Sequence, residues 1–216
     1  MTDAIFLSAG VPDPRRGPQY AQTADTVAIA AAISALVHVT LGRRLIVWGG
    51  QPAITPMIWV VAEGLGIDYA SWVRLYQSKH FEDEYPEDNR KFQNVIYTDD
   101  VLHNREMSLR TMREQMFSDF RFTAAVFIGG MDGIIEEFDL IKKMQPQAKL
   151  LPVVSTGGAV HDIAQRIGNF PTDLQDDLDY IALFHRHLGI SVKEMRYQRT
   201  TEQPLAIEER YWRPSE

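Results

Sequence analysis

Short apolar runs alternate with longer helix-forming segments along this chain, and this alternation constrains the fold more than any other feature. Six apolar runs are predicted to be strands: residues 4–8, 45–48, 72–76, 95–97, 124–128 and 150–154. Helices are predicted at residues 24–41, 55–65, 105–117, 134–144 and 159–167, and an acidic, solvated excursion at 82–90. Apolar strands that are each followed by a helix are typical of a parallel sheet covered on both faces. We therefore predict an α/β fold with a doubly wound, mainly parallel, Rossmann-like sheet.

The alternation stops near residue 168, although the chain continues to residue 216. A length of this order suits one domain, or one domain with an addition. We expect residues 1–168 to form the sheet domain. Residues 169–216 are predicted to form one helix, at 173–188, and a charged tail that packs on the sheet domain or on an oligomer partner.

Composition excludes several classes of function. The chain has 22 basic and 29 acidic side chains, so its net charge of −7 disfavours binding to a nucleic-acid polymer. Without cysteine there is no disulfide, thiolate metal site or cysteine nucleophile. The six histidines show no metal-binding spacing, and no cofactor is expected.

Membrane insertion is not expected either. Between residues 26 and 62 the only charges are Arg43 and Arg44, but glycine and proline at 49–52 and Pro56 interrupt this apolar stretch. Asp3 stands where a secretory leader would carry its basic region. We expect a cytoplasmic protein.

Glycine is concentrated at the ends of four predicted strands. Eight of the fourteen glycines lie there: Gly10, Gly49, Gly50, Gly129, Gly130, Gly133, Gly157 and Gly158. The carboxyl ends of parallel strands form the ligand crevice, and glycine there lets backbone amides approach an anion. Tight turns between strands and helices also use glycine, whatever the function. Four such ends together favour a phosphate-bearing ligand, although none is a Walker A loop or a clean G-x-G-x-x-G fingerprint.

Two of these loops resemble the SLOG superfamily, which includes LOG phosphoribohydrolases and nucleotide-sensing domains. Residues 129–137, which read GGMDGIIEE, follow a buried strand and are similar to the LOG pattern P-G-G-x-G-T-x-x-E. Residues 48–56, which read WGGQPAITP, resemble the first glycine loop of the sensor branch, GG-x-P-A-I-T-P. The resemblance spans about residues 4–168 and implies nucleotide binding.

The chain departs from the enzymatic LOG motif at several positions. Gly129 replaces its proline, Met131 its second glycine and Ile134 its threonine. The arginine of the preceding helix aligns with Glu114, and Arg113 is one residue away. The resemblance therefore implies a sensor more strongly than an enzyme that cleaves N-glycosidic bonds.

Individual residues have alternative interpretations. Arg105, Arg110 and Arg113 share one predicted helix and either bind phosphate or form a solvated face, with Arg113 favoured for binding by the resemblance. Glu137 either stabilises the start of its helix, contacts a ribose or acts as a general acid or base. The residues expected to contact the ligand are Ser8, Ala9, Gly10, Gly49, Gly50, Gln51, Arg113, Gly129, Gly130, Met131, Asp132, Gly133 and Glu137. Ser8 is expected at a phosphate, Asp132 at a ribose or in an Asx turn, and His103 is the one histidine placed near the crevice.

Three hypotheses follow. The leading one is a sensor domain for an ADP-ribose-like or cyclic nucleotide signal. The alternative is a LOG-like hydrolase of nucleoside monophosphates, in which Glu137 and Arg113 would be catalytic. The third is a scaffold that assembles through the helix at 173–188. We expect the partners to be a small nucleotide derivative, a second copy in a homodimer or larger homo-oligomer, and a separate effector protein.

Overall fold

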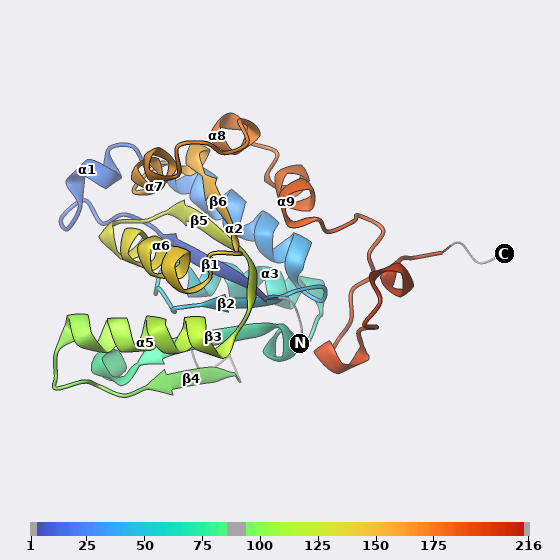
Figure 1. The fold of residues 1–216 in the computed structure, drawn as a ribbon, viewed down its shortest axis with the longest axis horizontal. Coiled ribbons are helices and arrows are strands. Elements are labelled where there is room, and N and C mark those ends of the chain that lie inside the picture. Colours follow the sequence, from blue (N-terminus) through green and yellow to red (C-terminus); the bar gives the residue numbers. More distant parts are fainter. Residues whose placement is uncertain (1–3, 86–93, 214–216) are drawn as a thin grey trace.

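A six-stranded parallel sheet forms the centre of the molecule, so the predicted fold class is confirmed (Figure 1). The computed structural model describes residues 4–85 and 94–213, so much of the predicted excursion at 82–90 lies outside the described residues. The strands are β1 (Ala4–Gly10), β2 (Leu45–Trp48), β3 (Val73–Ser78), β4 (Val95–Thr98), β5 (Phe122–Gly129) and β6 (Lys149–Val153). Their order is β4-β3-β2-β1-β5-β6, and every pair is parallel.

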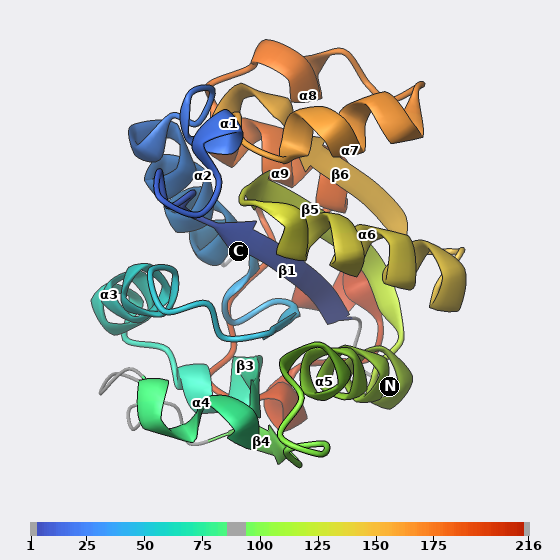
Figure 2. The same ribbon diagram turned by 90° about the vertical axis from the view of Figure 1, so that its left-hand side faces the viewer.

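Helices cover both faces of the sheet (Figure 2). They are α1 (Pro18–Ala21), α2 (Thr26–Thr40), α3 (Thr55–Leu65), α4 (Tyr69–Trp72), α5 (Arg105–Asp119), α6 (Asp132–Met144), α7 (Val160–Ile167), α8 (Asp173–Asp176) and α9 (Tyr180–Leu188). Short 3₁₀ helices are η1 (Lys79–Glu84), η3 (Val154–Thr156), η4 (Thr200–Glu202) and η5 (Ile207–Arg210). Helices α2, α3 and α9 pack on one face, and α5, α6 and α7 pack on the other.

Strand β1 shows why the sheet has two apolar faces. Ile5 and Leu7 point into the core beneath α2, whereas Phe6 points into the core beneath α5 and α6. Phe6 meets Phe117 of α5 edge to face, with ring centroids 4.8 Å apart. Alternate side chains of a strand point to opposite faces, so a strand buried on both sides is apolar throughout.

The helix boundaries follow local capping signals. Asp25 accepts hydrogen bonds from the amides of Val27 and Ala28 and starts α2, and Asn104 starts α5 in the same way. The single helix predicted at 173–188 is wrong. It is split into α8 and α9 because Asp177 leaves the helical conformation and Asp179 caps the new helix.

The strand order reverses direction in the middle of the sheet. The chain moves outward from β1 through β2, β3 and β4, and then returns to the other side of β1 to form β5 and β6. In open α/β sheets such a switch point leaves a crevice at the carboxyl ends of the strands. Ligand sites are therefore expected beside β1.

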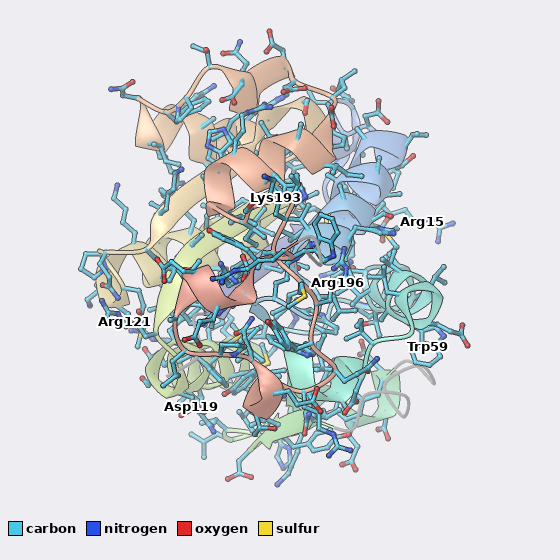
Figure 3. The ribbon with its side chains drawn as sticks, turned by 90° about the vertical axis from the view of Figure 1, so that its right-hand side faces the viewer. Arg15, Trp59, Asp119, Arg121, Lys193 and Arg196 are labelled. Atoms are coloured by element: carbon cyan, nitrogen blue, oxygen red, sulfur yellow. The ribbon has the colours of Figure 1, made fainter. Side chains whose placement is uncertain are left out.

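The tail after α9 lies at the opposite end of the molecule from α1 (Figure 1). Glu194 is 1% exposed and accepts two hydrogen bonds from Arg44, at 2.6 and 3.1 Å. Arg196 donates to the carbonyl oxygens of Leu41, at 2.6 Å, and His38, so it covers the C-terminus of α2. Burial lowers the pKa of Arg196 to about 10. Figure 3 views the molecule from the right-hand side of Figure 1 and shows Arg196 near the centre.

No helix among the described residues is long and apolar enough to cross a membrane.

Replacement of Glu194 by alanine tests how firmly the tail is fastened. We expect Glu194→Ala to lower the free energy of unfolding by about 3 to 5 kcal/mol, because the buried guanidinium of Arg44 loses its counter-ion. Urea unfolding measures the change. Glu208→Ala is the control, since Glu208 is exposed on the same tail. Equal stability of the two variants would show that the ion pair does not hold the tail.

Candidate functional site

A cavity of about 300 Å³ opens at the carboxyl ends of β1, β2 and β3 and at the start of α6. It lies at the switch point of the sheet, between the loops that follow β1, β2 and β3. Its volume is at the lower end of the range for small-molecule sites.

Ten of the thirteen predicted ligand residues line this cavity. They are Ala9, Gly10, Gly49, Gly50, Gln51, Arg113, Gly130, Met131, Gly133 and Glu137. These residues come from three βα loops and from α5 and α6, which are distant in sequence. The structure therefore brings most of the predicted site together.

Ser8, Gly129 and Asp132 do not line the cavity. Ser8 is buried beneath it and donates its hydroxyl to Glu137 Oε2 at 2.5 Å. Gly129 has a φ of +61°, and a Cβ there would lie 2.5 Å from the carbonyl oxygen of Gly10. Asp132 accepts a hydrogen bond from the hydroxyl of Tyr20 at 2.6 Å. Each of these three residues contacts other parts of the protein instead of the cavity.

Gly157 and Gly158 also serve packing. A Cβ on Gly157 would lie 1.9 Å from the carbonyl oxygen of Thr23, and one on Gly158 would lie 2.9 Å from that of Gly130. Neither glycine lines the cavity. At this loop the tight-turn interpretation of the glycines is the better one.

Arg113 and Glu137 meet at the cavity wall, although they lie on different helices. Arg113 donates from Nε to Glu137 Oε1 at 3.3 Å and from Nη2 to the carbonyl oxygen of Gly133 at 3.3 Å, and its Nη1 donates to Glu136. The Arg113 side chain is 8% exposed and that of Glu137 14%. The carboxylates of Glu136 and Glu137 neutralise the guanidinium of Arg113. Both oxygens of Glu137 accept hydrogen bonds, one from Ser8 and one from Arg113.

The other arginines of α5 have different environments. Arg110 pairs with Glu114 at 2.8 Å on the exposed side of the helix, as a solvated face would. Arg105 lines the cavity, and its guanidinium lies 5.8 Å from the centroid of the Phe81 ring. His103, expected near the crevice, is 95% exposed, pairs with Asp100 and does not line the cavity.

Sequence reasoning missed the side of the cavity formed by β3 and η1. Gln77, Ser78, Phe81 and Tyr85 line it, and Tyr85 donates its hydroxyl to the carbonyl oxygen of Ser78 at 2.7 Å. Gln77 and Ser78, two polar residues directly after the predicted strand at 72–76, were the sequence signal for this side of the cavity. Arg16, in the loop after β1, was also missed.

Three exposed charged side chains line the cavity, the cationic Arg16 and Arg105 and the anionic Glu84. Neither Arg16 nor Arg105 forms an ion pair with any residue in the described ranges, and the guanidinium of Arg105 lies over the ring of Phe81. Helix α6 begins at the cavity, and Met131 provides no side-chain cap for its first amides. Guanidinium groups and a helix N-terminus both favour anions. Within the described part of the chain, no group of histidine and acidic side chains is arranged to hold a metal ion.

A family model supports the predicted resemblance. The model of the SLOG cluster3 family matches residues 19–188. The chain belongs to this family. The match runs from within α1 to the end of α9 and therefore includes five strands, β2 to β6, and the loops that follow them. Membership of the SLOG group supports a nucleotide-related role for the Rossmann-like sheet.

One solved structure with a similar fold is the X-ray structure of TM1055, a target of the Northeast Structural Genomics Consortium. It is 13% identical, the alignment covers 76% of this chain and 81% of that chain, and the TM-score is 0.46. No curated protein matches the chain.

The contact between Tyr20 and Asp132 fastens α1 to the start of α6, and its strength can be measured by titration. The hydrogen bond to Asp132 and burial raise the pKa of Tyr20 to about 12, and Asp162 adds a weaker electrostatic effect. Because the ordinary value is 10.0, the contact stabilises the fold fully below pH 10 and loses this effect as the pH rises through 12.

We expect Asp132→Asn to lower the pKa of Tyr20 toward 10 and Asp162→Asn to lower it less. Tyrosinate absorbance during alkaline titration, with the Tyr20→Phe variant subtracted, gives the value. An unchanged pKa in Asp132→Asn would show that α1 is not fastened in this way.

Proposed function

We propose that this protein binds a nucleotide-derived small ligand, an ADP-ribose-like or cyclic nucleotide signal, in the cavity beside β1 and acts as a sensor domain. The observation that carries the proposal is the composition of the cavity. Five glycines line it, and so do the guanidinium groups of Arg16 and Arg105, which form no ion pair with any described residue.

The phosphate end of the ligand would lie against the start of α6. Gly130 and Gly133 line the cavity there and have no side chain to block an anion, and the amide of Gly130 itself is already bonded to the carbonyl oxygen of Gly10. Arg16 and Arg105 would neutralise its charge. A net charge of −7 cannot attract an anion over a distance, so these local groups would have to hold it.

The base end would lie against the aromatic and apolar wall of the cavity. Trp48, Phe81, Tyr85 and Met112 line this wall. Purine rings are flat and apolar on their faces, so aromatic side chains are suitable neighbours. The cavity therefore offers separate surfaces for the two parts of a nucleotide.

Gly49 offers a direct test, because an added methyl group would occupy the cavity. A Cβ on Gly49 would lie 3.2 Å from Met112 Cε and 3.6 Å from Glu137 Oε1. We expect at least one of ADP-ribose, its cyclised forms and a panel of nucleotides to bind in calorimetric titration. Gly49→Ala should weaken that binding about tenfold or more, because the ligand must displace the methyl group.

Gly64→Ala is the matched control for this experiment. Nothing lies within 4 Å of a Cβ on Gly64, which is exposed in α3 and far from the cavity lining. It should keep the wild-type affinity and stabilise the helix by about 0.5 to 1 kcal/mol. If no member of the panel binds the wild type, the proposed function is wrong.

A second candidate function is hydrolysis of the N-glycosidic bond of a nucleoside monophosphate. The contact of Arg113 with Glu137 at the cavity wall favours it, since a carboxylate there is placed to act as a general acid or base. Against it, both oxygens of Glu137 are engaged, and Met131 replaces a glycine of the LOG motif.

Incubation with AMP separates the two candidates. The sensor proposal predicts that no free adenine accumulates. If adenine is released, Glu137→Gln should slow the release about 100-fold or more, whereas Glu136→Gln should not. Glu136 is the appropriate control because it also contacts Arg113 but does not line the cavity.

A further inference from the structure

Gln77 is a buried polar residue of the cavity that the proposed phosphate contacts do not use. It lies near the carboxyl end of β3, is only 5% exposed and lines the cavity. A glutamine amide donates from its nitrogen and accepts at its oxygen, so each of these atoms can have a partner of its own.

The orientation of the Gln77 amide is fixed by the loop after β2. Its Nε2 donates to the carbonyl oxygen of Gly50 at 3.1 Å, and because a carbonyl oxygen only accepts, the nitrogen must be the atom that faces it. A Cβ on Gly50 would lie 1.9 Å from Nε2, so the loop and the amide fit closely. The nitrogen is thereby engaged, and the oxygen is the amide atom that remains for another partner.

The oxygen of Gln77 has no donor among the described residues. The other glutamine of the cavity differs, because Gln51 Oε1 accepts a hydrogen bond from the amide of Ile54 at 3.1 Å. Gln51 thus caps the turn before α3, whereas Gln77 has an acceptor left for a ligand.

We infer that Gln77 is the specificity-determining residue of the cavity and that its Oε1 accepts a hydrogen bond from an exocyclic amine of the ligand's base. This inference rests on the proposed function and adds that the base is of the adenine class. Phe81 and Tyr85 line the same end of the cavity and suit a flat ring. The ends of β1 and β3 are two strand spacings, about 10 Å, apart, which leaves room for a ribose between phosphate and base.

The test compares ligands that differ only in this amine. AMP and ADP-ribose are each titrated against the analogue in which purine replaces adenine, which removes the exocyclic amine and leaves the phosphates unchanged. We expect the wild type to prefer the amino form about tenfold, because the analogue leaves the oxygen of Gln77 unpaired.

Two variants separate recognition from a structural role. Gln77→Met removes the acceptor at similar volume and should abolish the preference. Gln77→Glu loses the bond to Gly50 but keeps oxygen acceptors, and should retain the preference even if both ligands bind more weakly. A residue with a structural role alone would weaken both ligands equally and leave their ratio unchanged.

Equal binding of each pair by the wild type would overturn this inference and leave the proposed function intact. A preference that survives in Gln77→Met would overturn the assignment to Gln77. Absence of binding by all four ligands would overturn the proposed function for these ligands and this inference with it.

Discussion

The close approach of three backbone segments at the switch point of the sheet determines how the site is built. The amide of Gly130 donates to the carbonyl oxygen of Gly10 at 2.7 Å, and the amide of Ala159 donates to the carbonyl oxygen of Gly130 at 3.0 Å. Side chains at Gly129 or Gly158 would collide with this backbone. The contacts bring the start of α6 to the end of β1, and the space left beside them is the cavity.

Electrostatics then separates the roles of the arginines. Arg113 is buried and held by two carboxylates, so it positions Glu137 and has little charge left for a ligand. Arg16 and Arg105 line the cavity beside Glu84 and form no ion pair with any residue of the described ranges. The tail uses arginine differently, because Arg44 is buried with Glu194 far from the cavity. Arginine therefore has three roles in this protein: it binds the tail to the sheet domain, it positions Glu137, and it places positive charge at the cavity.

Much of the fold could be predicted from the sequence, because apolar runs report burial and Asp25 and Asn104 mark helix starts locally. Only the SLOG resemblance assigned Arg113 and Glu137 to one site, since 24 residues separate them along the chain. Composition could not show which glycines face the cavity and which pack against backbone, because that depends on the neighbouring loop. Gln77 was missed for a similar reason. Its amide nitrogen is bonded to Gly50, in the loop after β2, and this contact between distant segments is not visible in the sequence.

The response of the glycine amides to ligand in a two-dimensional nitrogen–proton NMR spectrum shows directly whether the cavity binds it. During titration with ADP-ribose, we expect chemical-shift changes for the glycines of the cavity, Gly10, Gly49, Gly50, Gly130 and Gly133. The amide signals of Gly42, Gly66, Gly168 and Gly189, which lie after helices elsewhere, should keep their chemical shifts. Shifts confined to this second group, or none in either, would contradict the assignment of the cavity as the ligand site.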